Sequence, residues 1–157
     1  MPHVEQSIDI RVPPEKVFAI VAQQPERMPE WWSTFEKQER ITPSPTASGS
    51  ISRYVYNMLG IRIKGEHQVM QFDENRRLVV KTLSGLDSMF EFGFAPTETG
   101  TTLKVRIAYS LPGSVLGQLL NRLTIEQANE RDLIDALENL KAIAEREYSA
   151  SQLDGHE

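Results

Sequence analysis

The sequence has no cysteine among its 157 residues. This absence excludes disulfide bonds, thiolate nucleophiles and zinc sites built on cysteine. It also fits a reducing compartment better than an extracellular one, so we expect a cytoplasmic protein. The opening residues contain no basic segment followed by an apolar run, and no secretory signal is therefore expected.

Long apolar runs and an excess of basic residues are missing as well. No stretch approaches the roughly 20 apolar residues that a membrane-spanning helix requires, so no transmembrane segment is predicted. The 17 Lys and Arg residues are outnumbered by 22 Asp and Glu residues, which leaves a net charge of −5. Since nucleic-acid binding relies on clustered positive charge, we expect no nucleic-acid partner.

Residues that build catalytic or metal centres are sparse. The three histidines, His3, His67 and His156, lie far apart in the chain, and no metal site is predicted from them. The segment GSVLG at 113–117 has its serine in the second position rather than the third, so it is not a nucleophile elbow. No loop has the glycine and lysine spacing that cradles phosphate, and we expect no cofactor.

The composition that remains is typical of a globular protein, with 39% hydrophobic and 25% charged residues. We expect a single domain over residues 1–148, followed by a flexible tail over the small and polar residues 149–157. A homo-oligomer is compatible with this sequence but is not predicted by it.

The spacing of apolar residues predicts strands, two short helices and one long helix. Residues 4–12 alternate as a half-buried strand, 14–23 form a short helix, and 25–32 hold one or two further helical turns between prolines. Residues 33–111 contain several strands joined by short turns, which indicates an antiparallel meander. Gly65 lies inside one of these strands and suggests a β-bulge there.

Two strands have the clearest two-residue period. Phe90, Phe92 and Phe94 alternate with Met89, Glu91 and Gly93, and the next strand repeats the pattern. The apolar positions of that next strand are Leu103, Val105, Ile107 and Tyr109. One face of the sheet is therefore apolar and needs a cover, while the other faces water.

The long C-terminal helix is expected from residue 114 to about residue 148. At about 1.5 Å per residue it would span roughly 50 Å, which is longer than a domain of this size is wide. Its expected inward row is apolar at both ends and polar around EQANERD, residues 126–132, so we expect a kink or break there. The row runs through Leu116, Leu120, Leu123, Gln127, Glu130, Ile134, Leu137, Lys141 and Ala144.

Together these elements predict an α+β fold. A curved sheet of six to seven antiparallel strands wraps around the long C-terminal helix, and two short helices follow the first strand. Sheet and helix meet at their ends and leave an apolar pocket between them. Its expected lining comprises Phe90, Phe92, Phe94, Tyr109, Leu116, Leu120 and Leu123.

The chain resembles the SRPBCC superfamily, with its START-type, birch-pollen-allergen-type helix-grip fold, and within it the polyketide cyclase/dehydrase and lipid-transport branch. Four stretches, which span almost the whole chain in the family's order, carry this resemblance. They are VEQSIDIRVPPEKVFAIVAQQPERMPEWW, FDENRRLVVKTLSG, FEFGFAPTETGTTLKVRIAYSLPG and LIDALENLKAIAERE. The resemblance implies that a hydrophobic or amphipathic small molecule, lipid-like or polyketide-like, binds in a deep cavity.

Two main functions are compatible with the resemblance. The first is a binding or carrier protein that performs no chemistry on its ligand. The second is an enzyme of the cyclase, aromatase or dehydratase type, since some members of the family cyclise or aromatise polyketides in this cavity. A protein that acts only through its surface is a third alternative.

An enzyme of this kind would use isolated acid–base groups in the apolar pocket. The alternation does not decide which residues of 51–59 and 61–72 face inward. Facing the cavity, Tyr54 and Tyr56 would donate hydrogen bonds to a ligand carbonyl; otherwise they pack at the surface or against the first helices. Facing inward instead, Arg53 would clamp an anion or enolate, as the resemblance implies; otherwise it is solvated.

His67 and Glu130 complete the candidate catalytic residues. An inward His67 would be a base that titrates near neutral pH, and an outward one a surface or structural residue. Glu130 and Gln127 fall on the inward row of the long helix by phase. Facing the pocket, Glu130 would be a desolvated carboxylate with a raised pKa; alternatively, a kink turns this segment into water.

Both tryptophans, Trp31 and Trp32, stand side by side in MPEWWSTF, residues 28–35. Neighbours on a helix point about 100° apart, so we expect one indole to anchor the short helices and the other to lie at the cavity rim or in solvent. Trp32 shares a helical face with Met28 and Phe35, which makes it the expected anchor and a ligand-lining residue. Trp31 would be the more exposed, unless both indoles are structural packing.

Overall fold

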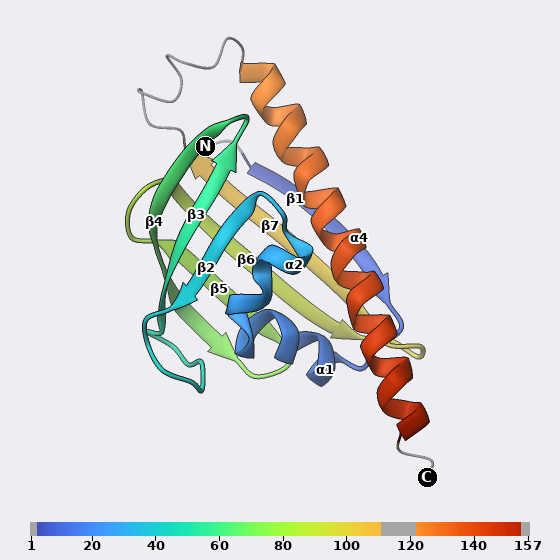
Figure 1. Cartoon of the computed structure of the whole chain (residues 1–157). Coiled ribbons are helices and arrows are strands. Elements are labelled where there is room, and N and C mark those ends of the chain that lie inside the picture. Colours follow the sequence, from blue (N-terminus) through green and yellow to red (C-terminus); the bar gives the residue numbers. More distant parts are fainter. Residues whose placement is uncertain (1–2, 111–121, 155–157) are drawn as a thin grey trace.

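Seven strands form one antiparallel sheet in the order β1-β7-β6-β5-β4-β3-β2 (Figure 1). The structure, a computed structural model, describes residues 3–110 and 122–154. The strands are β1 (His3–Ile10), β2 (Phe35–Arg40), β3 (Ile51–Met58), β4 (Ile61–Asp73), β5 (Arg77–Thr82), β6 (Asp87–Pro96) and β7 (Thr101–Ser110). β1 pairs with β7, whereas every other strand pairs with its neighbours in sequence. The predicted antiparallel sheet is confirmed.

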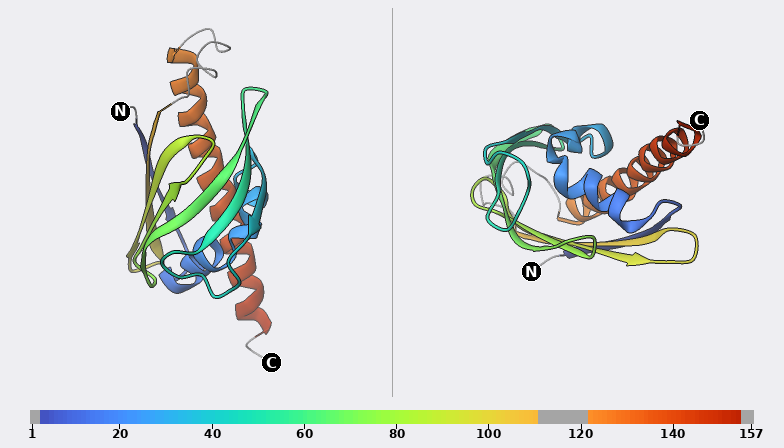
Figure 2. Two further views of the ribbon diagram at one scale, coloured as in Figure 1. Left: turned by 90° about the vertical axis from the view of Figure 1, so that its left-hand side faces the viewer. Right: turned by 90° about the horizontal axis from the view of Figure 1, so that it is seen from below.

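Short helices connect β1 to β2. α1 (Pro14–Phe18) begins at a proline, whose missing N–H is not needed in the first turn, and it runs on into a π-helical turn, η1 (Ala19–Gln23). A 3-10 turn, η2 (Pro25–Arg27), then leads into α2 (Met28–Trp31). Seen from below, these helices and the long helix lie on the concave side of the strongly curved sheet (Figure 2). The predicted helix-grip architecture is therefore confirmed.

The long helix, α4 (Arg122–Asp154), is a single helix of 33 residues. The break predicted within residues 126–132 is absent, so that prediction is wrong. The buried face of α4 is also displaced by about one residue from the predicted row, and it comprises Ile125, Leu133, Ala136, Leu137, Leu140 and Ala144. Asp132 lies beside this face and is hydrogen-bonded, so the polar middle of the helix does not have to turn into water.

The C-terminal end of α4 extends past the sheet (Figure 1). Helical structure continues to Asp154, so residues 149–154 form helical turns where the sequence suggested a flexible tail. The helix, at roughly 50 Å, is longer than the domain is wide. Its last turns project beyond the sheet, so no kink is needed to accommodate its length.

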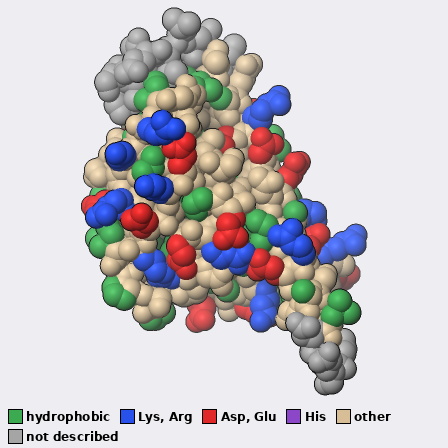
Figure 3. Space-filling model, viewed as in Figure 1, with side chains coloured by type: hydrophobic (Ala, Val, Ile, Leu, Met, Phe, Trp, Pro, Cys, Tyr) green, Lys and Arg blue, Asp and Glu red, His purple; other side chains and the backbone are tan. Residues whose placement is uncertain are grey.

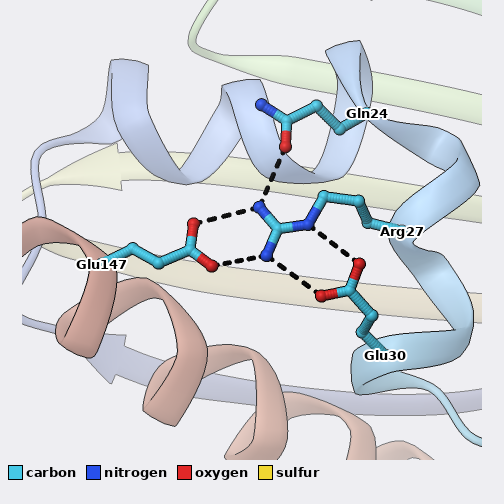
Figure 4. Close-up of polar contacts among 4 residues, drawn as sticks. All are labelled: Gln24, Arg27, Glu30 and Glu147. Atoms are coloured by element: carbon cyan, nitrogen blue, oxygen red, sulfur yellow. Dashed lines mark hydrogen bonds and ion pairs between the residues drawn. The ribbon is translucent and has the colours of Figure 1, made fainter.

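An ion-pair cluster fastens α4 to the short helices (Figure 4). Arg27 donates hydrogen bonds to both carboxylate oxygens of Glu147 on α4 and to both of Glu30 on α2. It also donates to the amide oxygen of Gln24 at 2.9 Å. The hydrogen bonds from Arg27 lower the pKa of Glu147, so the clamp stays charged at neutral pH.

The β-bulges of the sheet do not lie at Gly65, where the sequence suggested one. β3 and β4 pair through Gly65, opposite Tyr54, without a register shift, so the predicted bulge at this glycine is wrong. The register shifts lie instead at Met70 of β4 and at Glu36 of β2. Glycine is needed at 65 because a Cβ there would lie 2.1 Å from the carbonyl oxygen of Ser84.

Candidate ligand-binding site

The parity of β3 points its tyrosines into the concave side of the sheet. Tyr54 and Tyr56 are 0% and 7% exposed, and Met58 on the same parity is buried with them. Arg53 has the opposite parity and is exposed. The fold therefore does not bring Arg53 to the interior, where an anion clamp would have to lie.

A first pocket lies between the short helices and the sheet. Its apolar wall includes Val21, Ala22, Met28, Val69, Leu78, Val80, Phe90 and Phe92. Its polar side chains include Gln38, Arg40, Thr46, Ser52 and His67. A mainly apolar wall with a few convergent polar groups is typical of small-molecule sites.

A second pocket lies between the sheet and α4. Asn129 and Asp132 line it from α4. From the other elements its lining includes Val4, Trp32, Phe35, Tyr56, Leu86, Ser88, Phe90, Ile107 and Tyr109. Four of the residues predicted to line a cavity, Trp32, Tyr56, Phe90 and Tyr109, are thus brought together here.

An aromatic cluster stands between the two pockets. Phe90 lines both of them, and its ring centroid lies 5.8 Å from that of Trp32 and 5.5 Å from that of His67. Phe35 lies 5.6 Å from His67 and 5.3 Å from Trp32. The interior of the helix-grip fold is therefore divided by aromatic rings instead of forming one open cavity.

His67 faces the first pocket and is 4% exposed. Burial lowers the pKa of its imidazole to about 3, so the ring is neutral at physiological pH. The amide nitrogen of Gln38 lies 3.2 Å from Nδ1 and donates to it, because an amide NH₂ is not an acceptor. The ring proton then resides on Nε2. His67 faces inward, as one of its two alternatives predicted. The same alternative predicted titration near neutral pH, and the lowered pKa contradicts that part.

The hydroxyl of Tyr54 is hydrogen-bonded to the protein backbone. It donates to the carbonyl oxygen of Ser84 at 2.8 Å and accepts from the N–H of Leu86 at 2.9 Å. Burial also raises the pKa of Tyr54. Tyr54 lines neither pocket and instead supports His67 from behind, with the two rings stacked.

Asp132 is the main polar group of the second pocket, and the sequence did not single it out. Its carboxylate accepts hydrogen bonds from Nε1 of Trp32 at 2.9 Å, from the hydroxyl of Tyr56 at 2.9 Å and from Oγ1 of Thr34 at 2.8 Å. Burial, reinforced by this carboxylate, raises the pKa of Tyr56. The sequence signal that could have found Asp132 was its position close to the inward row of the long helix, where a polar residue is unusual.

Gln38 is the second residue that sequence reasoning missed. β2 reads FEKQER, in which no two-residue period is visible. The bulge at Glu36 turns both Phe35 and Gln38 inward although they are three residues apart. Because a bulge in a polar strand leaves no mark on the apolar pattern, the sequence carried no signal for Gln38.

Glu130 and Gln127 lie on the outside of α4, where Glu130 is exposed and Gln127 also faces away from the buried row. The displaced phase of the helix leaves both residues off the buried row and exposed, so the expected desolvated carboxylate at Glu130 is wrong. Glu130 instead accepts a hydrogen bond from the amide of Gln6 at 3.5 Å at the surface.

The other predicted lining residues have mixed placements. Phe94 is buried but lines neither pocket, since it packs edge-on against Phe18 with ring centroids 5.1 Å apart. Leu116 and Leu120 lie outside the described residues, and so does the side chain of Leu123.

Both tryptophans are buried, with Trp31 1% and Trp32 2% exposed. The expectation that Trp31 is the more exposed is wrong. α2 ends at Trp31, and Trp32 leaves the helical conformation with φ −118° and ψ 82°, so a helical angle between the two side chains does not apply. Trp32 lines the second pocket and Trp31 lines neither.

Within residues 3–110 and 122–154, no group of three or more His, Asp and Glu side chains is placed to hold a metal ion. Of the helices described, none combines the length and apolarity needed to cross a membrane. On the face drawn in Figure 3, acidic and basic side chains are intermingled and are not separated by sign.

Several solved structures share this fold. A protein from Thermus thermophilus matches with a TM-score of 0.77 at 21% identity, over 91% of this chain and 97% of its own. A START superfamily protein from Mycobacterium smegmatis matches with a TM-score of 0.72 at 17% identity, over 92% and 97%. Ara h 8.0201 matches with a TM-score of 0.66 at 15% identity, over 91% and 97%. At such identities these likenesses establish the fold alone.

No curated protein matches the sequence. Residues 1–145 match the family described as polyketide cyclase / dehydrase and lipid transport. This match covers almost the whole chain and agrees with the START-type structures, so the resemblance found in the sequence is confirmed. The chain thus belongs to the polyketide cyclase/dehydrase and lipid-transport family.

Proposed function

We propose that the protein binds and carries a hydrophobic or amphipathic small molecule, lipid-like or polyketide-like, on the concave side of its sheet. The observation that carries this proposal is the pair of apolar pockets that meet at Phe90. Apolar walls contribute roughly 25 cal/mol for each Å² of apolar ligand surface that they remove from water. The few polar groups in each pocket would orient the ligand.

The placement of the candidate catalytic residues favours binding over catalysis. Arg53 and Glu130 are exposed on outer surfaces. The hydroxyl of Tyr54 is engaged with the backbone of Ser84 and Leu86. Of the four candidates, only His67 lines the first or the second pocket, and its pKa of about 3 lies far from the neutral range in which a general base is most effective.

An enzyme of the cyclase/dehydrase type is the alternative, and His67 is the observation that favours it. His67 lines the first pocket, and its Nε2 has no partner among the described residues, so this N–H would polarise a ligand carbonyl by donating a hydrogen bond. Under this alternative, turnover of a polyketide-like substrate would be lost in His67→Gln while substrate binding survived. Under the carrier proposal, the wild-type protein leaves such a molecule chemically unchanged.

Native mass spectrometry of the purified protein, followed by titration with Nile red, tests the proposal. We expect a retained apolar small molecule, or saturable Nile red binding by protein from which any ligand has been extracted. A protein that is empty and binds no hydrophobic dye would contradict the proposal. Chromatography of the released ligand before and after incubation separates carriage from catalysis.

A further inference from the structure

Buried polar atoms without a hydrogen-bond partner belong to three residues that line the first pocket. They are Oε1 of Gln38, Nε2 of His67 and Oγ1 of Thr46, counted against residues 3–110 and 122–154. Leaving a buried polar atom unpaired costs about 1–3 kcal/mol, so each such atom calls for an explanation. All three belong to residues that line one pocket, and a ligand bound there is the partner that we infer for them.

The hydrogen bonds around Gln38 determine which atoms of Gln38 and His67 remain free as donors or acceptors. The amide nitrogen of Gln38 lies 2.6 Å from Oγ of Ser52 and 3.2 Å from Nδ1 of His67, so it is fully used. The amide oxygen is left as a free acceptor. Since Nδ1 of His67 accepts, Nε2 carries the proton and is a free donor. The pocket therefore presents one donor and one acceptor from neighbouring side chains.

Charge in the pocket is already balanced. Arg40, the cation in its lining, donates through Nε to the carboxylate of Glu26 at 3.1 Å and through Nη2 to the carbonyl oxygen of Gln23. His67 is neutral, and its other contacts are with the uncharged rings of Tyr54, Phe35 and Phe90. A carboxylate brought to His67 would lose its hydration without gaining a free cation, which is unfavourable.

We propose that the first pocket selects an uncharged, hydroxylated apolar ligand, whose hydroxyl groups accept from His67 Nε2–H and donate to Gln38 Oε1. This inference rests on the proposed function and specifies the ligand class of that site. A hydroxyl both accepts and donates, so it matches the donor and the acceptor. A carbonyl would leave Gln38 without a donor, and a pure hydrocarbon would leave both atoms unpaired.

Calorimetric titration with naphthalene, naphthol and naphthoate, which share one ring system, tests the inference. The wild-type protein is expected to bind naphthol about tenfold more tightly than naphthalene, and naphthoate more weakly than naphthol. His67→Phe keeps an aromatic ring against Tyr54 but removes the donor, and Gln38→Met removes the acceptor. In each variant the affinity for naphthol should fall to near the affinity for naphthalene.

Gln68→Met is the matched control for Gln38→Met, because Gln68 is the residue after His67, points to the opposite face of the sheet and lines neither pocket. It should keep the preference for naphthol. Equal binding of naphthol and naphthalene, tightest binding of naphthoate, or a preference that survives in both His67→Phe and Gln38→Met would overturn the inference and leave the carrier proposal standing. Absence of binding by all three compounds and by Nile red would instead refute the carrier proposal, and this inference with it.

Discussion

The imidazole of His67 lies flat against the phenol ring of Tyr54, with ring centroids 4.3 Å apart and ring planes inclined by 15°. Tyr54 is itself held by Ser84 and Leu86, so the stack rests on a rigid support. A titratable side chain is thereby placed in an apolar pocket in its neutral form. This relationship connects the fold, the pocket and the expected response of the protein to acid.

Acid should destabilise the wild-type protein more than a His67→Gln variant. Histidine in the unfolded chain titrates near 6.5, whereas folded His67 has a pKa of about 3. Between these values the unfolded state binds the extra proton, so the free energy of unfolding falls by about 1.4 kcal/mol for each pH unit of acidification. Urea denaturation of both proteins between about pH 6 and pH 4 measures the difference. If the free energy of unfolding fell equally with acid in both proteins, His67 would be protonated in the folded state, and the prediction would be wrong.

Asp132→Ala should lower the free energy of unfolding by about 2–4 kcal/mol, because it leaves the buried donors of Trp32 and Tyr56 without an acceptor. Asp135→Ala, at an exposed position of the same helix, is the control and should stay within about 0.5 kcal/mol of wild type. Urea denaturation followed by tryptophan fluorescence provides both values. Equal losses in the two variants would contradict the role assigned to Asp132.

Gly65→Ala should be strongly destabilising, by roughly 2–4 kcal/mol, because the new Cβ would meet the carbonyl oxygen of Ser84 and the hydroxyl of Tyr54. Gly93→Ala is the matched control in another strand. Its Cβ would meet nothing closer than 4.0 Å, so we expect no loss or a slight gain in stability. Thermal unfolding of the two variants distinguishes them, and a tolerated Gly65→Ala would refute the close packing described at this position.

The Arg27 clamp should contribute about 1 kcal/mol between α4 and the short helices, since its groups are partly exposed. A double-mutant cycle with Arg27→Ala and Glu147→Ala measures the coupling energy. Arg27→Lys keeps the charge but not the paired hydrogen bonds, and should recover less than half of the coupling. A coupling energy near zero would mean that the clamp is not formed in solution.

The two tryptophans should report differently on ligand binding. A brominated fatty alcohol, which quenches indole fluorescence on contact, should quench Trp32 in the Trp31→Phe variant, because Trp32 lines the second pocket. Trp31 in the Trp32→Phe variant should be quenched much less, since it lines neither pocket. Equal quenching in both variants would indicate that the alcohol binds outside the described pockets.

Much of the fold was predictable because it depends on short-range patterns. Side chains alternate across a strand, so Phe90, Phe92 and Phe94 could be placed on the inner face from the sequence, and all three are buried. Prolines and turn residues likewise located the short helices and the meander. The order of β2 to β7 then followed, because short connections join antiparallel neighbours, whereas the pairing of β1 with β7 was not predicted.

The site was less predictable because its geometry depends on contacts between distant segments. The row from which the helix phase was counted included Ile134 and Lys141, which are not buried, and stepping back along it put Glu130 and Gln127 on the inward side. A bulge at Glu36 brought Gln38 inside without any mark on the apolar pattern. The helix α2 ends at Trp31, and Trp32 leaves the helical conformation. The two indoles are therefore not held at a helical angle, and both can be buried.

The sequence by itself determined the fold class, the element order, the apolar face of the sheet and the family, since each depends on local periodicity or on a pattern spread along the whole chain. Only the tertiary structure decided that Arg53 points outward, that His67 sits neutral in a pocket beside Gln38, and that Asp132 gathers hydrogen-bond donors from distant parts of the chain. The reason is physical: burial and hydrogen-bond partners are properties of a place in the folded molecule, and residues far apart in the chain create that place together.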